Sequence, residues 1–202
     1  MVTDYRDCYE LRPATGSLSA TGFIFVSGGF VDPAAYIEAM APIVRAGYPV
    51  LIQKVPGNLA VLDAAGSLAL RGQVGGITRW VVGGHSLGGA MAANTVNANP
   101  AAFAGLVLEA AYPPDSASLA AWTRPVLSLS AQNDGLATPA KINDTKRLLP
   151  AATSYHQIAG GCHAFFGSYG AQDGDGMPTI TRAAQQAEAG QKIVAFLAGL
   201  GG

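Results

Sequence analysis

The sequence has little charge of either sign. Of its 202 residues, 12 are Lys or Arg and 13 are Asp or Glu, which gives a formal net charge of -1 at pH 7. Proteins that bind nucleic acid or an anionic membrane surface usually carry a basic patch or a basic segment. We therefore expect no nucleic acid and no anionic lipid surface as a partner.

Cysteine and long apolar runs are scarce as well. The two cysteines, Cys8 and Cys162, do not make a disulfide framework, and the sequence leaves open whether they pair with each other. No apolar run is long enough to span a membrane. The first residues contain no basic segment followed by an apolar stretch, so no signal peptide is visible. This favours a cytoplasmic location, although a secreted chain trimmed of its signal would look the same.

Hydrophobic residues and glycine, by contrast, are abundant. Hydrophobic residues make up 50 % of the chain and there are 26 glycines, a composition that excludes an intrinsically disordered chain. A chain of this length can bury one sizeable core. We therefore expect a single domain over residues 1–202, as a monomer or a small homo-oligomer.

Short apolar segments alternate with segments of helical periodicity. The pattern predicts strands at residues 23–26, 50–52, 80–82, 105–109, 125–129 and 154–158. It predicts helices at residues 32–47 (capped by Asp32 and kinked at Pro42), 59–71, 87–97, 139–149 and 180–198. This order indicates the α/β class, with a mostly parallel sheet covered by helices on both faces. Ligands of such sheets bind at the carboxyl ends of the strands.

One serine lies among glycines between a predicted strand and a predicted helix. The sequence Gly84-His85-Ser86-Leu87-Gly88 matches the G-x-S-x-G pattern in the strand–turn–helix context that the pattern requires. A nucleophilic serine there stands on a strained turn, and side chains at Gly84 and Gly88 would collide with neighbouring backbone. The N–H of Leu87 would stabilise an oxyanion, together with Gly29 from the loop after the first central strand. The alternative is a glycine-rich turn that contains a serine by chance.

A base must accept the proton of the serine, and the chain has three histidines. His163 follows the last predicted strand, so we expect it at the same sheet edge as Ser86 and assign it as the base. His85 points elsewhere from the turn and is expected to pack beside Ser86. His156 lies inside a predicted strand, where a structural or surface role is expected.

The base needs an acid that fixes its tautomer. Asp134 follows the strand at residues 125–129 and lies between Ser86 and His163 in the chain, which is the usual order of the three groups. Glu109 and Asp115, after the preceding strand, are the competing carboxylates. We expect Asp134 to be the acid, while its alternative role is that of an ordinary turn residue.

Together these motifs resemble the α/β-hydrolase superfamily, and in particular small serine esterases without a lid domain. The resemblance rests on the Gly-Gly loop at Gly28, the GHSLGG segment around Ser86, and the Gly-x-His-Ala-x-Phe-Gly segment around His163, and it extends from about Phe23 to Leu200. It implies a three-layer fold and acyl hydrolysis by Ser86, His163 and Asp134, with neither a metal nor a cofactor. The chain departs from many relatives in having Ser27 and Cys162 at positions where His or Pro, and a small polar residue, are more usual.

The expected substrate is a small-molecule carboxylic ester. Only about a dozen residues separate the strand that ends near Ala110 from the next one near Pro125, which leaves no room for a lid and predicts an open, shallow site. Such a site favours small esters with short acyl groups over long buried chains. Phe30 and Tyr112 are expected to line the pocket. An acyltransferase, thioesterase, amidase or perhydrolase would use the same residues, and a non-catalytic binding module is a further alternative.

The segment Gln172-Asp173-Gly174-Asp175-Gly176 resembles part of a calcium-binding loop. In an EF-hand register, however, the first and twelfth ligands would be Ala171 and Arg182, which cannot bind calcium. We therefore interpret the segment as a glycine-rich turn. A loose cation site and a role in shaping the rim of the pocket are the alternatives.

Overall fold

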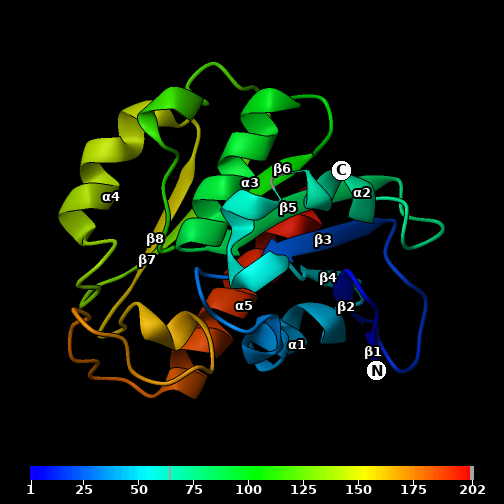
Figure 1. Cartoon of the computed structure of the whole chain (residues 1–202), viewed down its shortest axis with the longest axis horizontal. Helices are drawn as coiled ribbons and strands as arrows, with labels where there is room; N and C mark the ends of the chain where they lie inside the picture. The colour runs from blue at the N-terminus through cyan, green and yellow to red at the C-terminus, as the bar shows by residue number, and fades with distance from the viewer. Residues whose placement is uncertain (64, 201–202) are drawn as a thin grey trace.

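The computed structural model describes residues 1–63 and 65–200, and its centre is an eight-stranded sheet (Figure 1). The strands lie in the order β1-β2-β4-β3-β5-β6-β7-β8. Their bounds are β1 Val2–Asp4, β2 Cys8–Leu11, β3 Thr21–Val26, β4 Val50–Gln53, β5 Arg79–His85, β6 Gly105–Glu109, β7 Val126–Ala131 and β8 Ser154–Ile158. All six predicted strands are present, which confirms the α/β class.

The strands from β4 to β8 pair in parallel, whereas β1 and β2 pair antiparallel at one edge. These two N-terminal strands were not expected from the sequence. They are short, and β1 is largely exposed, so neither produces the continuous apolar signal of the central strands. The addition of an antiparallel pair to a parallel sheet is a common variation.

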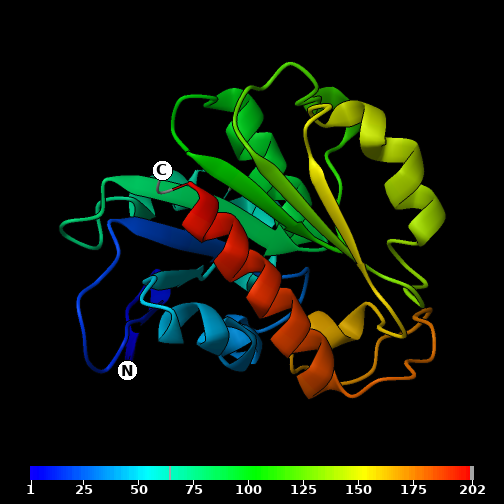
Figure 2. The same ribbon diagram turned by 180° about the vertical axis from the view of Figure 1, so that it is seen from behind.

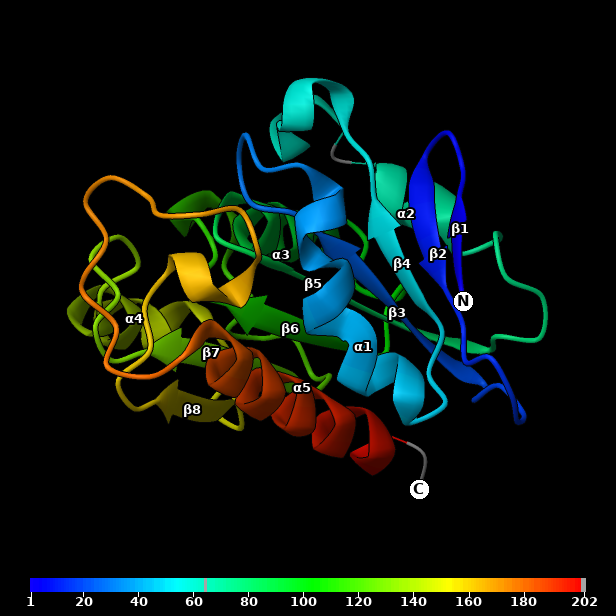
Figure 3. The same cartoon turned by 90° about the horizontal axis from the view of Figure 1, so that it is seen from below.

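Helices cover both faces of the sheet. Their bounds are α1 Ile37–Arg45, α2 Gly66–Leu70, α3 Leu87–Ala98, α4 Pro139–Thr145 and α5 Arg182–Gly199, with short 3₁₀ turns η1 Pro33–Tyr36, η2 Pro56–Asn58, η3 Ala60–Leu62, η4 Asp115–Ala117, η5 Lys146–Leu148 and η6 Ala164–Phe166. Figure 2 shows α5 crossing the face opposite to α3. Figure 3 shows α1 and α5 side by side on that face. The architecture is the three-layer one expected.

The core consists of two apolar clusters, one on each side of the sheet. Successive residues of β3 alternate between them: Phe23 and Phe25 belong to the cluster under α1 and α5, while Ile24 and Val26 belong to the cluster under α2 and α3. This alternation follows from the two-residue period of a strand. Because both faces are buried, the strand is apolar throughout, as the sequence indicated.

The helix predictions are confirmed in part. Asp32 caps η1 by accepting a hydrogen bond from Ala34 N, and α1 continues through Pro42 rather than ending there. A methyl group at Gly190 of α5 would come within 2.8 Å of Pro42, so this glycine lets the two helices pack closely. The single helix expected at residues 59–71 is wrong, because η3 and α2 are separate short elements. Within the described part of the 59–71 stretch, Ala60, Ser67 and Leu70 are buried, and residue 64 lies outside the described residues.

The two cysteines are buried, and both are free thiols. Burial raises the pKa of each to about 11, so both thiols are protonated near neutral pH. Within residues 1–63 and 65–200, no helix combines the length and the hydropathy needed to cross a membrane.

Candidate active site

Ser86 stands on a strained turn between the end of β5 and the start of α3. Its φ of 53° and ψ of -124° lie in a region that side-chain-bearing residues rarely adopt. The backbone N–H of Ser86 donates a hydrogen bond to Glu109 O at 3.0 Å, which anchors the turn to the neighbouring strand β6. The sequence pattern thus predicted the local geometry correctly.

The glycines around Ser86 are required by close backbone contacts. A methyl group at Gly84 would lie 2.5 Å from Val26 O, and one at Gly88 would lie 2.2 Å from Ser27 O. One at Gly89 would lie 2.5 Å from the methyl group of Ala111. All three distances are far below van der Waals contact, so a side chain at any of these positions would push α3 off the sheet.

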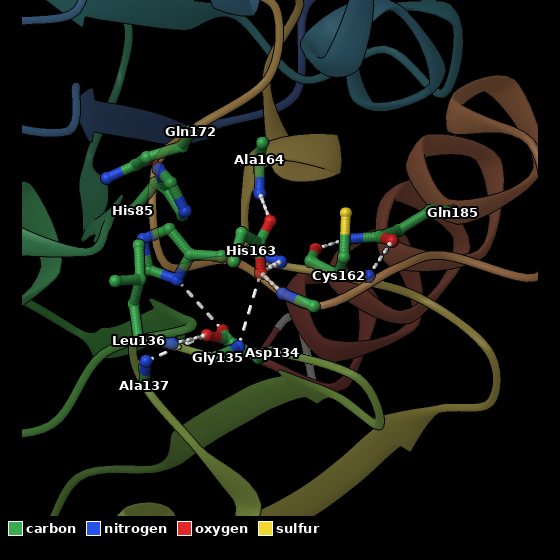
Figure 4. A network of polar contacts seen from close by, with 12 residues as sticks. His85, Asp134, Gly135, Leu136, Ala137, Cys162, His163, Ala164, Gln172 and Gln185 are labelled. Atoms are coloured by element: carbon green, nitrogen blue, oxygen red, sulfur yellow. Dashed lines mark hydrogen bonds and ion pairs between the residues drawn. The ribbon is translucent and has the colours of Figure 1, made fainter.

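The base and the acid proposed from the sequence meet in the structure. His163 Nδ1 lies 2.8 Å from Asp134 Oδ2, and the two side chains are almost completely buried (Figure 4). The other carboxylate oxygen of Asp134 accepts hydrogen bonds from Leu136 N at 2.8 Å and from Ala137 N at 2.7 Å. These bonds fix the carboxylate, and a carboxylate at Nδ1 places the lone pair of the neutral ring on Nε2.

The two competing carboxylates lie elsewhere. Asp115 is exposed in η4 and pairs with Arg147 at 2.6 Å. Glu109 is 2 % exposed, and burial raises its pKa to about 8. Its Oε2 has no hydrogen-bond partner among the described residues. The geometry therefore favours Asp134 as the partner of His163.

Ser86 and His163 line the same cavity, which has a volume of about 280 Å³. The other lining residues are mostly apolar: Leu87, Ala90, Ala110, Ala111, Tyr112, Leu136 and Ala137. His163 Nε2 is buried and has no hydrogen-bond partner among the described residues, so it is free to accept a proton. The cavity brings a hydroxyl and a ring nitrogen together in apolar surroundings.

The predicted pocket residues have different positions. Tyr112 lines the cavity, whereas Phe30 is 79 % exposed and does not line it. Residues 110–125 connect β6 to β7 and contain η4 as their one regular element. The connection is short, and the openness of the site stays a prediction.

A larger cleft of about 420 Å³ lies between the N-terminal strands and α1. Its lining is mostly apolar and includes Arg12 and Arg45, but it contains no serine, histidine or carboxylate. The smaller cavity holds the residues that can do chemistry, so size does not identify the site here.

The predicted oxyanion donors lie close together. A methyl group at Gly29 would be 3.0 Å from the side chain of Leu87, so the loop after β3 lies against the start of α3. Leu87 is the first residue of α3, where backbone N–H groups lack partners within the helix. The helix dipole adds to the attraction of negative charge at this point.

A second histidine ring packs against the base. The rings of His85 and His163 have centroids 4.4 Å apart. The Tyr36 hydroxyl accepts a hydrogen bond from Gly28 N at 3.1 Å and is hydrogen-bonded to His85 Nδ1 at 2.8 Å. Burial, followed by the proximity of His163, lowers the pKa of His85 well below its usual value, so His85 is neutral. The sequence indicated packing for His85 but gave no sign of Tyr36.

The segment before the base is held by a buried amide that sequence reasoning also missed. Gln185 of α5 accepts a hydrogen bond from Cys162 N at 3.0 Å and donates one to Cys162 O at 2.8 Å (Figure 4). The pair fixes the backbone one residue before His163. The third histidine, His156, lies on β8 and pairs with Glu188 at 2.6 Å, away from the cavity.

Comparisons with known proteins agree with this fold. A family model described as the alpha/beta hydrolase family matches residues 22–187. No curated protein sequence matches the chain significantly. Among solved structures, Est1E from Butyrivibrio proteoclasticus, with ferulic acid bound, superposes with a TM-score of 0.72 at 10% identity, covering 98% of this chain and 99% of that one.

Two further solved structures are similar over nearly the whole chain. The propionate-bound Est2 esterase from Thermogutta terrifontis gives a TM-score of 0.69 at 16% identity, covering 100% of this chain and 94% of that one. The esterase domain of a Rhodothermus marinus protein gives 0.69 at 13% identity, covering 94% and 90%. At these identities the likeness concerns the fold alone.

Proposed function

The chain belongs to the alpha/beta hydrolase family, and from this premise we propose that it is a serine hydrolase that cleaves carboxylic esters. The observation that carries the proposal is the arrangement around His163. Its Nδ1 is hydrogen-bonded to the buried Asp134. Its Nε2 has no partner within residues 1–63 and 65–200, and His163 lines a cavity that Ser86 also lines. A nucleophile, a base and an orienting acid are thereby available in the roles that acyl transfer requires.

In the proposed reaction, Ser86 Oγ attacks the ester carbonyl while His163 Nε2 accepts the hydroxyl proton. The backbone N–H groups of Leu87 and Gly29 stabilise the resulting oxyanion. His163 then gives the proton to the leaving alcohol, which leaves an acyl group on Ser86. Water, activated by the same histidine, attacks the acyl-enzyme and releases the acid. Asp134 keeps the proton on Nδ1 and stabilises the ring when it becomes positively charged.

The proposed substrates are esters with short acyl groups. A cavity of about 280 Å³ lies at the lower end of the usual range for small-molecule sites. Its lining of alanine and leucine side chains suits an apolar acyl chain, and Tyr112 lies at the same surface. The structure of the fold neighbour Est2 contains bound propionate, a carboxylate of the size that this cavity suits.

The test is intact-mass analysis after treatment with a fluorophosphonate, combined with turnover of p-nitrophenyl esters of increasing chain length. We expect one adduct on the wild type, no adduct on Ser86→Ala, and the highest kcat/KM for acetate to butyrate esters. Ser17→Ala, which changes an exposed serine, is the matched control and should label like the wild type. A folded wild type that neither labels nor turns over ester would overturn the proposal. An adduct without ester turnover would keep the activated serine and indicate another acyl substrate.

A further inference from the structure

The segment after η6 returns to the catalytic loops and inserts a carboxylate between them. Asp175 Oδ1 accepts hydrogen bonds from Gly135 N at 3.2 Å, from His163 N at 3.0 Å and from Gly176 N at 2.8 Å. Asp175 Oδ2 accepts one from Ala164 N at 2.8 Å. Figure 4 shows Gly135, His163 and Ala164 gathered around this point.

These bonds join the two loops that carry the acid and the base. Gly135 follows Asp134 directly, and His163 donates its own backbone N–H. The loops are also linked directly, by bonds from Asn133 N to Gly161 O and from Gly160 N to Gln132 Oε1, both at 2.8 Å. Asp175 thus adds a contact from a third segment to the two loops whose side chains, His163 Nδ1 and Asp134 Oδ2, meet at 2.8 Å.

Asp175 is charged under ordinary conditions. Partial burial acts to raise the pKa of its carboxyl group, but the hydrogen bonds from Ala164, His163 and Gly135 outweigh this, and the pKa lies below its usual value. Hydrogen bonds to an ionised acceptor are shorter and stronger than neutral ones. No other kind of side chain of this size can accept four of them.

Close packing fixes the position of the segment. A methyl group at Gly135 would lie 2.1 Å from Gly174 O, and one at Gly176 would lie 1.9 Å from Asn133 O. The backbone around Asp175 therefore touches the loop of Asp134 directly. Since Gln185 holds Cys162 from the other side, the backbone of His163 is fixed from two directions.

We propose that Asp175 is a positioning residue of the catalytic site, which holds the backbone of His163 in register with Asp134 so that the imidazole Nε2 faces Ser86. The inference rests on the proposed function and extends it by a fourth side chain. Asp175 does not touch the cavity, so it acts through His163 and Asp134 rather than on substrate.

The first test is Asp175→Asn, which keeps the shape of the side chain but replaces one acceptor oxygen by a donor. Facing backbone N–H groups, the amide loses hydrogen bonds and places a half-buried N–H donor against other donors. We expect kcat for p-nitrophenyl acetate to fall about 10- to 100-fold, as for a misplaced catalytic group, with KM within about twofold of the wild type. Asp173→Asn makes the same charge change at an exposed position of the same segment and should leave kcat unchanged.

The second test reads the base–acid hydrogen bond directly. The Nδ1 proton of His163 gives a downfield proton NMR signal, assigned by its absence in His163→Ala, and we expect it to be lost or broadened in Asp175→Asn. Gly176→Ala provides an independent variant, because it keeps the carboxylate but pushes the segment away from Asn133. It should reproduce the loss of kcat and of the signal. Both variants are measured at a temperature at which circular dichroism shows them folded.

The outcomes separate this inference from the proposed function. Wild-type kcat and an unchanged Nδ1 signal in Asp175→Asn would overturn the positioning role. A loss of kcat with an intact signal and a raised KM would also overturn it, since that pattern belongs to substrate binding. If the wild type fails to label with fluorophosphonate, the proposed function fails. The NMR signal still decides whether Asp175 holds His163 against Asp134.

Discussion

The proposed nucleophile, Ser86, and the proposed acid–base pair, Asp134 and His163, are held in place by opposite means. At the end of β5, Ser86 is fixed by close packing, because the neighbouring glycines have no side chains and let backbone segments touch. After β7 and β8, the loops are fixed by carboxylates that accept hydrogen bonds from backbone N–H groups. Asp134 accepts them from its own loop, and Asp175 accepts them from the loop of His163. One region relies on close packing and the other on charge.

This contrast determines how each region fails. The turn at Ser86 cannot accept an extra atom, because its neighbours are already at contact distance. The loops around Asp134 can accept a change of size more easily than the loss of an acceptor, because each carboxylate satisfies several buried donors. Adding a methyl group should therefore disrupt the first region, and removing a charge should disrupt the second.

The largest effect is expected from removing the charge at Asp134. Asp134→Asn keeps the shape of the side chain but favours the wrong tautomer of His163, so kcat/KM for p-nitrophenyl acetate should fall by about 10⁴-fold. Steady-state kinetics with single-turnover labelling would measure it. Asp144→Asn, on the exposed side of α4, is the control for loss of one carboxylate. A loss below about tenfold would exclude Asp134 as the acid.

The next largest effect should come from adding a methyl group beside Ser86. Gly88→Ala lies in α3, where helix propensity alone would stabilise the protein by about 1 kcal/mol. The methyl group would lie 2.2 Å from Ser27 O, and such overpacking costs about 1–3 kcal/mol or more. We expect a lower free energy of unfolding in urea. Gly75→Ala, at a position with open space around it, is the control, and equal stability of the two variants would contradict the packing argument.

Glu109 shares a feature with each region: it is the residue whose carbonyl anchors Ser86, and its side chain is a carboxyl group. Among the described residues, however, its Oε2 has no hydrogen-bond partner. Its pKa is raised from 4.5 to about 8 in the folded protein, so the folded state binds the proton more tightly than the unfolded state does. Stability should therefore decrease as pH rises from about 4.5 to about 8, and level off above that. The loss is on the order of a few kcal/mol.

Glu109→Gln should remove most of this pH dependence and be more stable than the wild type at pH 9. Urea unfolding at several pH values measures it, with Glu38→Gln on the exposed side of α1 as the control. An unchanged slope between pH 5 and pH 8 would show that another group causes the dependence.

The smallest effect concerns the link between the glycine loop and the two histidine rings. Tyr36→Phe removes the hydroxyl that binds Gly28 N and His85 Nδ1. Leaving these buried groups without partners should cost about 1–3 kcal/mol of stability, with a decrease of kcat of less than about tenfold. Thermal unfolding and steady-state kinetics measure both. Tyr5→Phe, near the exposed N-terminus, is the control, and a Tyr36→Phe variant as stable as the wild type would contradict the role given to the hydroxyl.

The same contrast explains what the sequence could predict. Close packing at Ser86 leaves a local pattern of glycines, and the order of strand ends then indicated Asp134 and His163. Hydrogen bonds from backbone N–H groups to a carboxylate leave no such local pattern in the sequence. The hydrogen bond between Asp175 and Gly135 joins residues 40 positions apart. The sequence alone does not distinguish an aspartate that binds a distant loop from one in an ordinary turn.

Other parts of the fold escaped prediction for a related reason. Neither β1 nor β2 has a continuous apolar signal, because the pair lies at the edge of the sheet. Gln185 is polar yet completely buried. Its amide forms hydrogen bonds with both the N–H and the carbonyl oxygen of Cys162. Local hydrophobicity cannot reveal either feature, since both depend on which distant backbone groups need a partner.

The position of β8 at the end of the sheet has a consequence for heat tolerance. The strand is partly exposed and has β7 as its neighbour on one side only, while β5 is surrounded by strands. Edge elements open locally at a lower free energy than the centre of a sheet does. His163 follows β8, so fraying of this edge would displace the base while Ser86 stays in place. On heating, loss of turnover should therefore precede the loss of helical circular dichroism, and amides of β8 should exchange with deuterium before those of β5.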